Sequence, residues 1–152
     1  MSEGFDLKNV EVSWVLGILR VEQLPRLATE ALTAGFRSKL FEKLAACSPE
    51  ESQLIRQLFE DAIKENGGGK ISKLEALREY AKQISVSILD STISPFEGAK
   101  LIWRAATNAG VKEYHELDGF IYAASELEDR PDDQVFFEKA IRVEAKHLID
   151  EF

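Results

Sequence analysis

The sequence predicts an all-α protein, a single-domain bundle of about seven helices with short connections, and three observations support this fold class. First, serine stands three residues before glutamate at Ser48–Glu51, Ser72–Glu75 and Ser94–Glu97. In such a capping box the serine oxygen accepts a backbone N–H of the first turn, and the glutamate reaches back to the serine N–H. Second, apolar residues recur at intervals of three and four after each of these starts. Third, the chain offers no convincing pair of strands.

The first third of the chain has the weakest pattern. Residues 10–16 (VEVSWVL) are rich in branched and aromatic side chains, which favour a short strand. Together with the two apolar residues that follow at 18 and 19, their spacing suits a helix at least as well, so both alternatives stay open. We expect a short helix over residues 25–34 that ends at Gly35, and another over residues 38–46.

The rest of the chain is expected to form five helices. They cover residues 48–65, 72–88, 94–108, 117–127 and 131–150. The glycines at 67–69 stop the first of these. Gly98 lies in the first turn of the third, where glycine costs about 1 kcal/mol relative to alanine. We therefore expect a close helix contact at Gly98, with the turn at 88–92, and we expect Phe96, Ile102 and Trp103 of the same helix to pack into the core.

Length and composition restrict the classes of protein. A chain of 152 residues suits one domain, 1–152, whose core needs neither metal nor disulfide. Neither a secretory leader nor an apolar run of about 18 residues is present, so we expect a cytoplasmic protein that does not cross a membrane. The net charge of −8 argues against direct binding to nucleic acid or anionic membranes, because both need clustered Lys and Arg. An electrostatic partner would therefore be basic.

Three short patterns suggest chemistry, and none is complete. Residues 67–72 (GGGKIS) lack the first glycine of a phosphate-binding loop, where Lys64 stands. Glu144 and His147 have the Glu-x-x-His spacing of bundled di-iron sites, but the other histidine has no matching glutamate. Cys47 has no sequence-adjacent activator, and its apolar setting predicts a buried structural thiol. The sequence therefore predicts no catalytic residue, no metal ligand and no cofactor, and it favours a protein that is not an enzyme.

Negative charge is concentrated between residues 113 and 133, where eight acids and one arginine carry a net charge of −7. Acids at 132–133 suit the start of a helix, whereas those at 126–129 fall at the C-terminal end of the preceding helix, where the helix dipole disfavours them. This segment is either a solvated surface or a face that docks a basic partner. The residues of the predicted face are Glu113, Glu116, Asp118, Glu126, Glu128, Asp129, Asp132 and Asp133.

Three segments together resemble a family of small, uncharacterised bacterial proteins. They are residues 24–35 (LPRLATEALTAG), 93–103 (ISPFEGAKLIW) and 120–131 (FIYAASELEDRP). The resemblance implies a cytoplasmic bacterial helical domain, and it supplies neither an activity nor catalytic residues.

These observations lead to three hypotheses. The preferred one is an acidic interaction protein whose segment 113–133 binds a basic partner, for example an immunity-type inhibitor of a cationic toxin such as a nuclease. The alternative is a small-ligand binder or enzyme with a pocket between helices, lined by Trp103, Tyr114, His115 and Tyr122. The third is a homodimer in which the apolar seam of a second copy completes the bundle.

Overall fold

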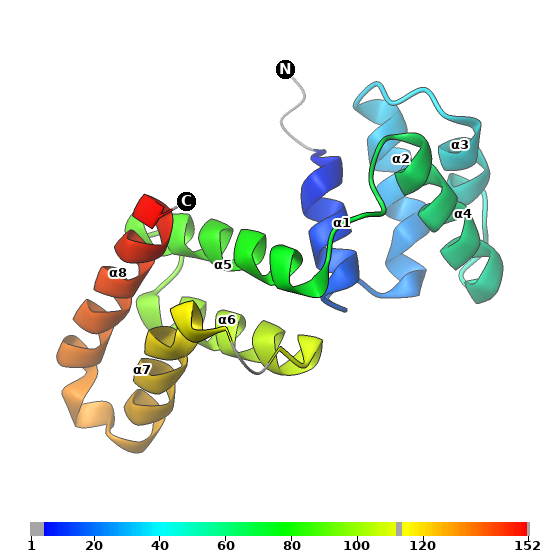
Figure 1. Cartoon of the computed structure of the whole chain (residues 1–152). Helices are drawn as coiled ribbons and strands as arrows, with labels where there is room; N and C mark the ends of the chain where they lie inside the picture. The colour runs from blue at the N-terminus through cyan, green and yellow to red at the C-terminus, as the bar shows by residue number, and fades with distance from the viewer. Residues whose placement is uncertain (1–4, 112–113, 152) are drawn as a thin grey trace. The chain divides into compact units, whose positions relative to one another are not determined.

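The computed structural model describes residues 5–111 and 114–151, which are helical throughout most of their length (Figure 1). These residues form eight α-helices, three short 3-10 helices and no strand, so the all-α prediction is confirmed. The count is eight rather than about seven, and the ambiguous segment near the start is one of the helices. Among the described residues, none of the helices combines the length and the hydropathy needed to span a membrane.

The chain divides into two compact units, Met1–Ser72 and Lys73–Phe152. The first contains α1 (Leu7–Val15), η1 (Val21–Gln23), α2 (Leu24–Thr33), α3 (Lys39–Ala45) and α4 (Ser52–Glu65). The second contains α5 (Lys73–Leu89), α6 (Pro95–Ala109), η2 (His115–Leu117), α7 (Asp118–Asp129), η3 (Pro131–Asp133) and α8 (Gln134–Glu151). Whether both units unfold together as one domain stays a prediction.

Aromatic rings fill the core of the first unit. Phe36 contacts Phe5 and Phe41 edge to face, and Trp14 contacts Phe59 in the same way with ring centroids 5.2 Å apart. α3 packs against α2 and α4 around these rings. Edge-to-face pairs add roughly 0.5–1.5 kcal/mol to the burial of the rings themselves, so this unit is held mainly by large side chains.

The core of the second unit combines large side chains with a helix, α6, whose buried face consists mostly of small residues. α6 buries glycine and four alanines along one face and packs against α5, α7 and α8. Small side chains let helix backbones approach closely. A Cβ atom on buried Gly98 would lie 2.6 Å from side-chain carbons of Ile88 on α5, which confirms the close contact expected there.

The predicted helix starts are correct at two of three places. Ser94 caps α6, since its hydroxyl accepts the Glu97 N–H at 3.2 Å, and α5 begins directly after Ser72. The predicted N-cap at Ser48 is wrong by three residues, because the N-cap of α4 is Glu51. The Ser48 N–H donates to the Glu51 carboxylate at 3.1 Å, but this pair closes a turn ahead of α4 rather than its first turn.

The predicted core residues of α6 are only partly correct. Ile102 is fully buried, whereas Phe96 and Trp103 are half-buried. Both aromatic residues lie beside the buried stripe of the helix rather than in it. The exposed side of the Phe96 ring carries the Lys100 ammonium, which lies 4.5 Å from the ring centroid.

Candidate functional site

The acidic segment runs along α7, and the structure does not gather it at one point. Glu116 and Asp118 stand at the start of this helix, while the other described acids stand at its end. Glu113 lies outside the described residues. About ten residues of helix separate the two groups, which corresponds to roughly 15 Å. We call the group at the end of α7 the acidic corner, consisting of Glu126, Glu128, Asp129, Asp132 and Asp133.

Arg130 lies within the acidic corner and neutralises part of it. Its guanidinium is 2.8 Å from the Glu126 carboxylate and 4.0 Å from that of Asp133. The hydrogen bond to Glu126 is the largest cause of the raised pKa of Arg130. Asp129 and Asp132 are exposed, and within the described part of the chain no ion pair forms on either. The corner therefore keeps unneutralised negative charge toward solvent.

Two exposed hydrophobic residues follow the acidic corner after Gln134, and we call Val135 and Phe136 the apolar pair. Their exposed fractions are 83% and 68%, the two highest among the exposed large hydrophobic residues of the described chain. Phe136 contacts the ring of buried Phe137 edge to face at 5.1 Å. The sequence contains the signal for this feature: three consecutive apolar residues span too wide an arc of a helix for all of them to face the core.

The four residues of the predicted pocket have different surroundings. Trp103 lines a shallow hollow of about 210 Å³ whose lining also includes Glu128 and basic residues of α6, but none of the other three. Tyr114 is buried, and its hydroxyl accepts a hydrogen bond from the Arg78 side chain at 3.0 Å. His115 is exposed beside Asp118, and Tyr122 is 60% exposed on α7. This hollow contains one of the four residues, and a pocket that all four line stays a prediction.

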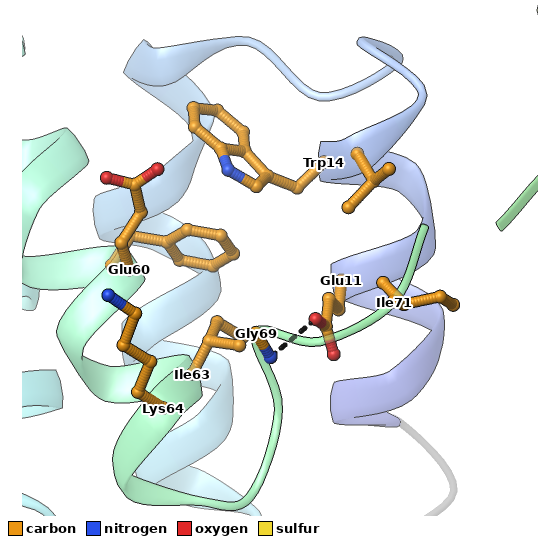
Figure 2. A pocket seen from close by; sticks show the side chains of 9 residues that line it. Glu11, Trp14, Glu60, Ile63, Lys64, Gly69 and Ile71 are labelled. Atoms are coloured by element: carbon orange, nitrogen blue, oxygen red, sulfur yellow. Dashed lines mark hydrogen bonds between the residues drawn. The ribbon is translucent and has the colours of Figure 1, made fainter. Parts of the chain in front are cut away.

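A pocket that the sequence analysis missed lies in the first unit, between α1 and α4 (Figure 2). Its volume is about 210 Å³. Figure 2 shows Glu11 and Trp14 of α1 on one side, with Glu60 and Lys64 of α4 on the other. The lining is completed by Val15, Phe59, Ile63, Gly69 and Ile71.

The glycines that end α4 also hold one wall of this pocket. The Gly69 N–H donates to the Glu11 carboxylate at 2.7 Å, as the dashed line in Figure 2 shows. A Cβ atom on Gly68 would lie 2.6 Å from both the Glu11 carboxylate and the Ile63 side chain. Only glycine therefore lets the backbone pass this close. Residues 67–69 are a helix stop, as predicted, and they also fix a carboxylate 58 residues away.

The prediction that the Cys47 thiol is buried is wrong. The side chain is half-buried rather than buried, because Cys47 follows the end of α3 at the edge of the core. Its thiol donates to the Lys43 carbonyl at 3.4 Å. Desolvation raises the pKa of the thiol, and the Glu51 carboxylate raises it further. This environment disfavours the reactive thiolate.

Metal-ligating residues are dispersed over the described part of the chain, where no group of three or more His, Cys, Asp or Glu could hold a metal ion. Glu144, half of the Glu-x-x-His pattern, lies against Gly119 of α7. Glu144 therefore contributes to the contact between α7 and α8.

Comparison of the chain with models of protein families, with curated proteins and with solved structures gives no match. The resemblance to a bacterial family stays a prediction.

Proposed function

We propose that this protein is an acidic interaction module that binds a basic partner protein through the acidic corner and the apolar pair. The observation that carries the proposal is the position of Val135 and Phe136, which are exposed and separated from Asp133 by one residue. A monomer gains nothing from holding an aromatic ring in water, whereas burying such a side chain against a partner is worth about 1.5–3 kcal/mol.

The apolar pair has the properties of an interface anchor. Aromatic residues are enriched among those that dominate binding energy, and they act best when surrounded by polar groups that exclude water. Phe136 rests against the buried ring of Phe137, which restricts its freedom before a partner arrives. A side chain that is already ordered loses less entropy on binding.

The charges around the anchor select the partner. Asp129 and Asp132 are exposed acids on the connection that leads to the apolar pair. Exposed charges of this kind accelerate association with an oppositely charged protein and disfavour acidic partners. The matching surface has lysine or arginine residues around an exposed apolar side chain. A cationic toxin such as a nuclease is one concrete partner with this chemistry, in which case the protein would act as its immunity-type inhibitor.

The test begins with capture of partners from host extract at low and high salt, followed by binding measurements with the purified basic partner. Phe136→Ser should weaken binding at both salt concentrations. Glu128→Lys with Asp129→Lys should weaken it mainly at low salt, because salt screens exposed charges. The matched controls are Leu54→Ser, which changes an exposed apolar residue of α4, and Glu30→Lys with Glu42→Lys, which changes the net charge equally.

Unchanged binding by both corner variants, or equal weakening by the control variants, would contradict the proposal. Circular dichroism of each variant separates loss of binding from loss of fold.

A further inference from the structure

We propose that the pocket between α1 and α4 binds a small organic cation, namely an ammonium group attached to an apolar body of about one ring. The pocket lies in the first unit and shares no residue with the acidic corner. Its ligand is therefore independent of the proposed function, and either inference can fail alone.

The size and walls of the pocket define the apolar body. Trp14, Phe59 and Ile63 give the pocket an aromatic and aliphatic surface. The volume of about 210 Å³ exceeds that of an apolar cavity of about 150 Å³, which accommodates benzene. One six-membered ring with a short side chain fits this space, and a nucleotide does not.

The charges of the pocket define the polar group. Glu11 and Glu60 contribute two carboxylates from facing helices, whereas Lys64 contributes one ammonium (Figure 2). The lining therefore carries one net negative charge. Because the Gly69 N–H holds Glu11 in place, this carboxylate needs no reorganisation when a cation arrives. An ammonium can donate a charge-assisted hydrogen bond to it, which is stronger than a bond between neutral groups.

The Trp14 ring is already in contact with one cationic side chain. The Arg56 guanidinium lies 5.3 Å from the centroid of this ring. Arg56 lines the neighbouring hollow and not the pocket, so it leaves the pocket free for a second positive group. The electron-rich face of an indole attracts a cation electrostatically. Anions find no comparable partner, since the lining has one lysine, Lys64, against two glutamates.

The probe for the experiment is phenethylamine, compared with phenethyl alcohol, which has the same ring and chain without the charge. Trp14 fluorescence reports binding in a Trp103→Phe background, because the chain has two tryptophans. We expect saturable quenching by the amine and roughly tenfold weaker binding of the alcohol, which lacks the hydrogen bond between charged groups. Amide resonances of Gly69 and Ile71 should shift with the same midpoint.

The variant Glu60→Gln removes one negative charge of the pocket by changing an exposed side chain. It should weaken the binding of phenethylamine several-fold and leave the affinity for phenethyl alcohol unchanged. Glu30→Gln, an exposed acid of α2 outside the pocket, is the matched control. Equal affinity for amine and alcohol, or equal affinity of Glu60→Gln and the parent for the amine, overturns the proposal. So does the absence of a saturable response to the amine.

Discussion

Gly98 of α6 lies so close to Ile88 of α5 that a methyl group on Gly98 would come within 2.6 Å of two carbons of the isoleucine. Ile88 is fully buried and cannot move into solvent. The absence of a side chain at residue 98 therefore sets the distance between these two helices. The same glycine weakens the first turn of α6 by about 1 kcal/mol, so the close packing offsets a local cost.

The first prediction concerns Gly98→Ala. The added methyl group should lower the free energy of unfolding by about 1–3 kcal/mol, because an overpacked contact costs more than the gain in helix propensity. Urea unfolding followed by circular dichroism measures the change. Gly119→Ala on α7 is the matched control, since its methyl group would meet Glu144, which can swing aside. Equal destabilisation by both substitutions would contradict this explanation.

The second prediction concerns Ser85 on α5, which is fully buried and whose hydroxyl has no hydrogen-bond partner among the described residues. An unsatisfied buried hydroxyl costs about 1–3 kcal/mol. Ser85→Ala should therefore raise the free energy of unfolding by roughly 1 kcal/mol. Half-buried Ser87 on the same helix provides the control, and Ser87→Ala should change stability less. A destabilised Ser85→Ala variant would show that the hydroxyl has a partner.

The third prediction is a loss of stability at alkaline pH. Burial raises the pKa of Tyr80 and of Tyr114, more than the nearby Arg104 and Arg78 lower it. The folded state therefore prefers the neutral phenols. An unfolded tyrosine ionises near about pH 10, so this contribution is complete below that pH and is lost as the pH rises above it.

Urea unfolding at a series of pH values around the phenol pKa measures this loss. Tyr80→Phe should flatten the decline, whereas Tyr122→Phe, which removes a phenol that is 60% exposed, serves as the control. A decline that is identical in parent and Tyr80→Phe would disprove the role of Tyr80.

The fourth prediction concerns the reactivity of Cys47. Since desolvation and then Glu51 raise the pKa of the thiol, less thiolate is present at any given pH than in free cysteine. Iodoacetamide should therefore alkylate the folded protein more slowly than it alkylates free cysteine near pH 8. Glu51→Gln should accelerate alkylation, whereas Glu42→Gln should not. A rate in Glu51→Gln equal to that of the parent would exclude the electrostatic contribution.

The fifth prediction distinguishes the effect of the acidic corner on partner binding from its effect on the stability of the fold. Glu128 and Asp129 occupy the last turn of α7, where the helix dipole disfavours negative charge. Reversing both to lysine should therefore keep or raise the melting temperature while it weakens binding to a basic partner. A lower melting temperature would mean that these acids stabilise the fold.

Local features of the structure could be predicted from the sequence. The cap at Ser94 and the helix stop at 67–69 depend on neighbouring residues, and the close contact at Gly98 joins residues only ten positions apart across one short connection. Ser48 shows where such reasoning fails, because a serine and a glutamate at the same spacing also close an isolated turn.

The candidate sites could not be predicted in the same way. The pocket brings Glu11 to Gly69 across 58 residues, and no local pattern encodes that contact. The exposure of the apolar pair could not be predicted for another reason. Helical periodicity indicates which apolar residues share a face of a helix, but it does not indicate whether the rest of the chain covers that face. The acids beside the pair gave the stronger signal in the sequence.

The hydrogen bond between Glu11 and Gly69 also has a topological consequence. The chain enters the first unit through α1 and, after three further α-helices, leaves it beside the same helix. Because Glu11 is the central residue of α1, a bridge from Gly69 to the first residue of this helix has to span roughly 6 Å along the helix axis. A unit with this geometry tolerates circular permutation, with the new ends placed in the connection between α2 and α3. The same geometry allows the unit to be inserted into a surface loop of another protein.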